Sequence, residues 1–173
     1  GDLDDVTIDG QAHSVTSRYV EERFFDIFPV EFLSGLTAGQ ALPPNSAVIT
    51  EVAAMRLYSR LDVVGERLLI DNEHDVVIAA VAKRFEQPSH LDSGIPLFTS
   101  DFYFPMEIRD NANRQRRIAA GVDPDADQWS NQSNYVYIEI PEDMVFDLDS
   151  FHAELNEFVQ TALPEDLRET MTY

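Results

Sequence analysis

Seven consecutive apolar residues at positions 76–82 (Val-Val-Ile-Ala-Ala-Val-Ala) constrain the fold more than any other segment. A strand with one solvent-facing side alternates apolar and polar residues, whereas a strand covered on both sides is apolar throughout. A shorter run at residues 67–70 precedes it, across the polar residues 71–75. Two such runs around a short polar turn indicate a β-hairpin. The sequence therefore predicts a sheet with residues 76–82 as a central strand buried on both faces.

The order of the other elements favours an α+β domain. Further strands are predicted over residues 15–20, 47–49, 97–106 and 135–140, and helices over residues 21–28, from residue 51 onward, over 114–120 and over 148–162. Because these strands do not alternate strictly with helices, a purely parallel sheet is not expected. We expect a mixed β-sheet with helices packed on one face.

Two of the predicted helices carry clear start signals. Thr50 is expected to cap the helix that begins at Glu51, with Val52, Met55 and either Tyr58 or Ser59 on the face that packs. An aspartate at position 147 or 149 caps the last helix. Its apolar stripe at helical spacing comprises Leu148, Phe151, Leu155, Phe158, Val159 and Ala162.

The most aromatic segment, residues 97–106, has two interpretations. Phe98, Phe102, Tyr103 and Phe104 could line a groove, but aromatic side chains on a strand are more often core. We therefore expect them to be core residues.

The charge balance excludes several classes of partner. With 12 basic and 32 acidic residues the net charge is −20, so the surface repels phosphate backbones and anionic lipid headgroups. No apolar run approaches the roughly 18 residues that cross a bilayer, and residues 1–5 do not resemble a signal peptide. The absence of cysteine excludes disulfides, thiolate nucleophiles and cysteine-ligated metals.

Motifs of catalysis and of cofactor binding are missing from the sequence. There is no Gly-x-Ser-x-Gly elbow, no phosphate-binding glycine loop and no zinc spacing among His13, His74, His90 and His152. Residues 123–127 (Asp-x-Asp-x-Asp) resemble the start of a calcium loop, but Gln128 and Asn134 replace the required Gly and Glu. We therefore expect no enzyme, no cofactor and no metal site.

Four of the twelve cations lie within nine residues, namely Arg109, Arg114, Arg116 and Arg117. On so acidic a chain they form a candidate contact patch for an acidic partner. The alternative is that they neutralise aspartates of the same segment.

An ordered series of short motifs gives the sequence a family resemblance. The series runs through Val20-x-x-x-Phe24-Phe25, Val30-x-Phe32-Leu33-Ser34-Gly35-Leu36, residues 47–58, residues 62–70 and residues 76–85. Taken together, these motifs resemble the extracytoplasmic (periplasmic core) domain of MacB/FtsX-type ABC transporter permeases. Residues 135–140 and the helix at 148–162 are similar to the segment that returns the chain toward the second membrane helix.

Two positions depart from the family pattern. The family's "VVGVV" strand has a glycine where this sequence has Ala79 or Ala80, so the tight backbone contact that this glycine permits is not expected. The arginine that follows the "leG" turn in the family is Leu36 here.

The resemblance implies a role without catalysis, in a bacterial inner-membrane permease with this domain on the periplasmic side. It implies a porter-like α/β lobe at residues 1–87 and 133–173 and a mostly β inserted lobe at residues 88–132. The implied partners are a cognate ABC ATPase subunit, a second permease protomer, and a periplasmic adaptor or lipoprotein. The domain would contact substrate or these partners and relay ATPase-driven movement during export.

Two other classes of protein remain open at this point. A free-standing periplasmic solute-binding or sensor domain would have a signal peptide and no membrane helices in its full-length gene. A hydrolase with a site assembled from scattered acids would show metal-dependent turnover.

Overall fold

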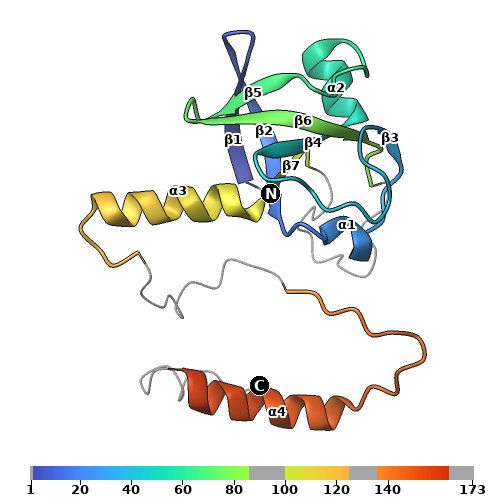
Figure 1. Ribbon diagram of the computed structural model, residues 1–173, viewed down its shortest axis with the longest axis vertical. Coiled ribbons are helices and arrows are strands. Elements are labelled where there is room, and N and C mark those ends of the chain that lie inside the picture. The colour runs from blue at the N-terminus through green and yellow to red at the C-terminus, as the bar shows by residue number, and fades with distance from the viewer. Residues whose placement is uncertain (1, 86–99, 125–135, 164–173) are drawn as a thin grey trace. The chain divides into compact units, whose positions relative to one another are not determined.

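The computed structural model describes residues 2–85, 100–124 and 136–163 (Figure 1). The chain forms two compact units, Gly1–Pro124 and Asp125–Tyr173, and each is described by itself. The first unit contains β1 (Asp2–Ile8), β2 (Gln11–Val20), α1 (Phe24–Ile27), β3 (Phe32–Ser34), β4 (Ser46–Thr50), α2 (Glu51–Tyr58), β5 (Arg67–Ile70), β6 (His74–Ala82), β7 (Phe102–Pro105) and α3 (Met106–Ala119). The second contains α4 (Leu148–Ala162). The division into lobes at residues 1–87 with 133–173 and at 88–132 stays a prediction.

The strands of the first unit close into a small barrel. The described residues form a sheet in the order β3-β6-β4-β7-β2-β1-β5, and β5 pairs in addition with β6. That pairing joins β1, β2, β7, β4, β6 and β5 into a ring, with β3 beside β6 outside it (Figure 1). The β2–β7 and β4–β6 pairs are parallel and the others antiparallel. The α+β class and the mixed sheet are thus confirmed, whereas the closure was not predicted.

The core lies on two sides of the barrel wall. The larger cluster takes residues from every strand of the ring, which places it in the barrel interior, and includes Phe102 and Phe104. Tyr103 points the other way, into a second cluster that covers the outer wall together with α1. The prediction that residues 102–104 are core is confirmed, while Phe98 lies outside the described residues. Each fully buried large apolar side chain contributes about 1.5–3 kcal/mol before entropy.

The strand β6 is the wall shared by both clusters. Val76, Ile78 and Val81 face the interior, and Ala80 and Ala82 belong to the outer cluster. The β5–β6 hairpin is confirmed, and burial on both faces holds for the C-terminal half of β6. Helices do not share one face of the sheet, because α1 packs in the outer cluster and α2 in the inner one. The expectation of helices on one face was therefore wrong.

A tight backbone contact sits where β3 meets β6. Gly35 has φ +86°, and a Cβ built on it would lie 2.0 Å from the carbonyl oxygen of Ala79 and 2.7 Å from the Cα of Ala80. Ala79 is the extra residue of a bulge, because β4 pairs Ala47 with Ile78 and then Val48 with Ala80. No tight backbone contact was expected at Ala79 and Ala80, but the structure has one there, and Gly35 on the opposing segment makes room for it.

Of three local expectations, one is confirmed and two need correction. Thr50 does cap α2, since its Oγ1 accepts a hydrogen bond from the Ala53 N–H at 3.3 Å. However, the helix buries Ala53 and Ala54, while Val52 and Met55 are about half exposed. Tyr58 of the predicted stripe does pack against the core. The prediction was wrong for Val52 and Met55, because the two small alanines approach the barrel more closely than larger side chains can. The structure also shows no strand over residues 136–140, where a strand was expected.

The remaining differences concern elements that were missed or whose length differs from the prediction, such as α1 and β7, which are shorter than predicted. The strand β1 was not predicted, because the aspartates at its start obscure the alternation of apolar and polar residues. The residues Asp9-Gly10, with φ of 49° and 78°, are nevertheless a typical hairpin turn between β1 and β2. The helix α3 spans Met106–Ala119, whereas a helix was predicted only over residues 114–120. The helix α4 and its cap at Asp147 are confirmed.

Candidate interaction surface

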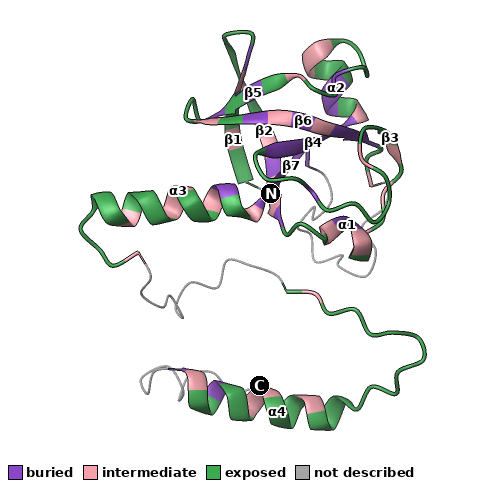
Figure 2. Cartoon of the chain, in the orientation of Figure 1, coloured by how far each residue is buried: buried purple, intermediate pink, exposed green. Residues whose placement is uncertain are grey.

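All four arginines singled out in the sequence lie on α3, which follows β7 without a loop. Figure 1 shows this helix running out past the edge of the barrel. Arg109 and Arg117 are partly buried, and Arg114 and Arg116 are exposed. In Figure 2 the buried part of α3 is confined to its start, and the rest of the helix is exposed or intermediate. We call residues 106–109 the root of α3 and residues 114–122 its tip.

The root is fixed to the barrel by packing and by one cation–π contact. Ile108 is 5% exposed and belongs to the interior cluster. The Arg109 guanidinium carbon lies 5.6 Å from the centroid of the Tyr19 ring on β2, and that ring lies 5.8 Å from Phe104. Arg109 therefore contributes to the seating of α3 on the barrel.

Tyr19 is held in place at its hydroxyl end. Its hydroxyl donates to the Asp4 carboxylate at 3.2 Å, and the Ser17 hydroxyl donates to the same carboxylate. Burial raises the pKa of Tyr19, and the neighbouring Asp4 charge raises it further. Burial also raises the pKa of Asp4, partly offset by the hydrogen bonds from Ser17 and Tyr19. The ring under Arg109 is therefore a neutral, oriented phenol.

At the tip, Arg117 stabilises the end of the helix. Its Nε donates to the backbone carbonyl of Asp123 at 2.9 Å, and its Nη2 donates to the same oxygen. This contact folds the segment after the helix back onto the last turn. Arg116 donates to the Asn113 side-chain oxygen at 3.1 Å.

Arg116 and Arg117 of the tip bind other acceptors than several of the remaining cations do. Five basic side chains elsewhere in the described residues are paired with carboxylates. These pairs are Arg23–Asp26, Arg56–Asp101, Arg60–Glu66, Arg67–Asp75 and Lys83–Glu31. The bonds of Arg116 and Arg117 go instead to neutral oxygen acceptors. Whether the four-arginine cluster contacts a partner or neutralises aspartates of its own segment stays a prediction.

Apolar side chains accompany these cations. Ile118 is 49% exposed and Val122 47% exposed. Ile118 lies four residues after Arg114, so the two share a face of the helix. These two exposed residues were not predicted from the sequence, because an isolated isoleucine in a polar helix can equally well be buried or exposed.

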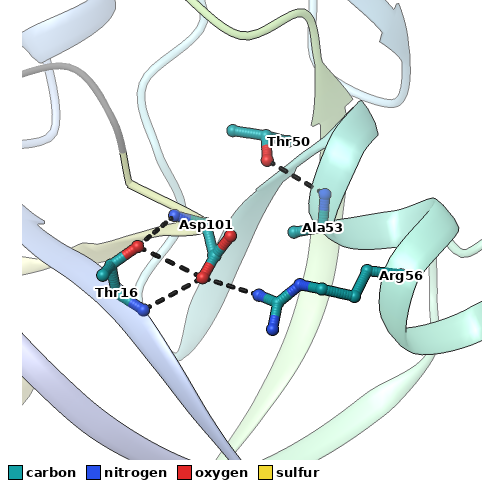
Figure 3. A network of polar contacts seen from close by, with 5 residues as sticks. All are labelled: Thr16, Thr50, Ala53, Arg56 and Asp101. Carbon is teal, nitrogen blue, oxygen red and sulfur yellow. Dashed lines mark hydrogen bonds and ion pairs between the residues drawn. The ribbon is translucent and has the colours of Figure 1, made fainter.

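A polar network fixes the start of β7 and hence the position of α3 (Figure 3). The Asp101 carboxylate accepts from the Thr16 N–H at 3.0 Å and from the Thr16 hydroxyl at 3.1 Å, and it pairs with Arg56 of α2 at 2.7 Å. Along the backbone, the Asp101 N–H donates to the Thr16 carbonyl at 2.8 Å, and the Thr50 N–H donates to the Asp101 carbonyl at 2.9 Å. Asp101 thus ties together β2, β4, α2 and β7.

Other exposed apolar side chains occur in both units. On α2 and the loop after it they are Val52, Met55, Leu61 and Val64. In the second unit, the α4 stripe leaves Leu148 and Phe158 each 54% exposed, and buries Val159.

Among the described residues, no cluster of three or more His, Asp or Glu is arranged to hold a metal. His90, Asp125 and Asp127 lie outside the described residues. The described helices include none with the length and apolarity to cross a membrane.

Comparison with known proteins gives a family match and a set of structural neighbours. Residues 3–144 match the family model described as the MacB-like periplasmic core domain. No curated protein sequence matches the chain.

Three solved structures are similar to the chain. A domain described as part of a permease protein from Porphyromonas gingivalis has a TM-score of 0.59 at 14% identity, covering 93% of this chain and 66% of that one. The periplasmic region of MacB from Actinobacillus actinomycetemcomitans has a TM-score of 0.55 at 11% identity, with 92% and 63% covered. The extracellular domain of the ABC-type transporter YknZ from Gram-positive bacteria has a TM-score of 0.47 at 12% identity, with 64% and 54% covered. The first two share the fold, and this chain spans less than two thirds of their length.

Proposed function

The chain belongs to the family of MacB-like periplasmic core domains, and from that premise we propose that it is the extracytoplasmic domain of an ABC transporter permease of the MacB/FtsX type. The permease lies in the bacterial inner membrane, with this domain on the periplasmic side. The observation that carries the proposal is the family match over residues 3–144, which includes all of the barrel except Asp2.

In this role the domain transmits movement and catalyses nothing. ATP binding by the cognate ATPase subunit moves the membrane helices, and the domain passes that movement to a substrate or a periplasmic partner. A ring of paired strands supports the proposal, because closing the sheet pairs the strand edges that would otherwise bend or slip. The Asp101 network adds a fixed joint between the ring and the start of β7.

Three partners follow from the proposal: the cognate ATPase, reached through the membrane part; a second permease protomer; and a periplasmic adaptor or lipoprotein. The last is the partner that would use a surface of the domain itself. Loops and projecting elements on a stiff scaffold are the usual carriers of such contacts.

The coding sequence around this chain provides the first test. The proposal predicts one apolar membrane helix before the domain and three after it. A signal peptide and no membrane helices would instead support a free-standing solute-binding or sensor domain.

Protease accessibility provides the second test, using the full-length protein in its own membrane. Protease added to intact spheroplasts should cut within this domain, because the domain faces outward. Protection of the domain until the membrane is lysed would contradict the extracytoplasmic location.

A further inference from the structure

We infer that residues 136–140 become a β-strand by pairing antiparallel with the same segment of a second copy of this chain, with Ile138 opposite the partner's Ile138. This inference rests on the proposed function, because it assigns a contact surface to the second permease protomer. It concerns the second unit alone.

The sequence of this segment is that of a strand. Residues 135–140 (Tyr-Val-Tyr-Ile-Glu-Ile) are aromatic or β-branched except for one glutamate, and Pro141 follows them. Successive side chains of a strand point to opposite faces, so Val136, Ile138 and Ile140 would share one face. This pattern is typical of a strand whose apolar face is buried.

The structure leaves that apolar face in solvent. Residues 136–140 are not a strand, and Val136 is 84% exposed, Ile138 64% and Ile140 44%. Figure 2 shows the stretch of chain before α4 as exposed along most of its length. Large apolar side chains exposed so close together mark an interaction surface. A strand takes its backbone hydrogen bonds from a neighbouring strand, so the missing element is a second strand.

The one charge of the segment favours an antiparallel pair of identical strands. Antiparallel pairing centred on Ile138 places Val136 opposite the partner's Ile140, and Glu139 opposite the partner's Tyr137. The apolar face then continues across both strands, and no two glutamates are directly opposite. In a parallel pair in register, Glu139 would lie beside the partner's Glu139, and neighbouring like charges destabilise a sheet. Because each copy uses the same surface, the antiparallel pair is also closed by a twofold axis.

A ribbon of two short strands also needs a layer that covers its apolar face. The chain that follows the segment offers apolar side chains for this purpose. Met144 is 57% exposed, Val145 96% and Leu148, at the start of α4, 54%. A helix packed on one face of a sheet is a common layer arrangement, so pairing would bury residues that a single copy leaves in solvent.

The charge of the chain sets the conditions under which free copies pair. Each copy carries a net charge of −20, so two copies repel each other at low ionic strength. Salt shortens the range of this repulsion, to about 3 Å at 1 M. In a permease dimer, the common membrane raises the effective concentration of the two domains. We therefore expect the isolated chain to pair at high protein concentration and more strongly as salt is added.

Disulfide formation between single introduced cysteines tests the pairing and its register. The full 173-residue chain has no cysteine of its own. In the proposed register, the two copies of position 138 are about 5 Å apart at Cα, which suits a disulfide. The matched control is Val136→Cys, because the two copies of position 136 are offset by four residues, or about 13 Å. Under mild oxidation in salt, Ile138→Cys should form a linked dimer at least about tenfold faster than Val136→Cys. A mixture of Val136→Cys and Ile140→Cys chains should link the two variants to each other.

Hydrogen exchange on the unmodified chain provides a second readout. The amides of residues 136–140 should gain at least about tenfold protection between micromolar and millimolar protein. Ile138→Lys should abolish this gain, because it places a charge on the apolar face. The control is Val64→Lys, which makes the same change of charge at a side chain 42% exposed in the first unit and should keep the gain. Far-UV circular dichroism on each variant confirms the fold.

Three outcomes would overturn the inference. Neither cysteine variant forms a dimer at millimolar concentration, or both form it equally fast, as a parallel pair or random collision would give. In the third, the amides of residues 136–140 are protected to the same extent at every concentration, which would show pairing within one chain. None of these results bears on the membrane helices or on protease accessibility, so this inference and the proposed function can fail independently.

Discussion

The barrel and the C-terminal unit differ in how far they bury their apolar side chains. In the barrel, Ile49, Ile78, Phe102 and Phe104 have no exposed surface, and they are contributed by strands far apart in the sequence. In the C-terminal unit, α4 has a well-formed cap and a regular stripe, yet Leu148 and Phe158 are half exposed. A locally specified helix can thus form without a closed core, whereas a barrel strand has no structure apart from its neighbours.

The largest loss of stability is expected at Gly35, where the backbone of the segment after β3 lies against β6. In Gly35→Ala, the new Cβ would lie against the Ala79 carbonyl at an unfavourable positive φ, so we expect a loss of about 4 kcal/mol or more in the free energy of unfolding. The control is Gly39→Ala, which has φ +79° but nothing within 4 Å, and it should cost about 1–2 kcal/mol. Urea unfolding measures both, and equal losses would show that the β3–β6 contact is loose.

A pair of phenylalanine truncations tests the comparison of the two units directly. Phe104→Ala empties a fully buried site and should cost about 3–4 kcal/mol, while Phe158→Ala, at a site 54% exposed, should cost less than about 1 kcal/mol. Thermal and urea unfolding followed by circular dichroism give both values. If Phe158→Ala proves as costly as Phe104→Ala, the stripe of α4 is buried in solution and the contrast fails.

A smaller effect is expected at the polar joint of the barrel. Asp101→Ala leaves the Thr16 N–H and the Arg56 guanidinium without their shared carboxylate, which should cost about 1–3 kcal/mol. The control is Asp75→Ala, which removes one partner of the exposed Arg67–Asp75 pair and should cost at most about 1 kcal/mol. If the two variants lost similar stability, the Asp101 network would contribute no more than an exposed ion pair.

The smallest expected effect is the pH dependence of stability, and its direction is opposite for Asp4 in the barrel and Asp147 in the C-terminal unit. Burial raises the pKa of Asp4 in the barrel, so its charged form disfavours folding; this penalty disappears as the pH falls through the raised pKa. The Ser150 hydroxyl and backbone N–H lower the pKa of Asp147 at the α4 cap, so that cap weakens as the pH falls from the ordinary aspartate pKa through the lowered one.

Carboxyl chemical shifts recorded from pH 2 to 6 check both signs. The Asp4 midpoint should lie above the ordinary value and the Asp147 midpoint below it. In Asp4→Asn the barrel should lose its part of the pH dependence, while the α4 signals titrate as before. Midpoints displaced in the same direction would contradict this assignment.

The sequence predicted those parts of the fold that local patterns encode. The 76–82 run, the Thr50 and Asp147 caps and the core aromatics at 102–104 all depend on a residue and its near neighbours. Barrel closure depends instead on the β5–β6 and β1–β5 pairings together, and no local pattern shows that both occur. The buried face of α2 was missed for a similar reason, since Ala53 and Ala54 face the core only because the barrel lies so close.

The candidate surface was predicted in composition but not in detail. Four closely spaced arginines were visible in the sequence. The contacts of Arg109 with Tyr19 and of Arg117 with the Asp123 carbonyl appear only in the structure. The Asp101 network was also invisible, because it joins Thr16 to a residue 85 positions later in the chain.

Rigid transmission by the barrel is most directly tested by electron–electron distances in the full-length permease with its ATPase in nanodiscs. This chain has no cysteine, so Glu73→Cys and Gln115→Cys place two spin labels at exposed positions of one protomer, once any cysteines elsewhere in the permease are replaced. Diluting the labelled protomer with unlabelled protein isolates the Glu73–Gln115 distance, and Gln115→Cys alone reports the distance between protomers. The account predicts that ATP changes the distance between protomers and leaves the distance within the domain constant. An ATP-driven change within the domain, or none between protomers, would contradict it.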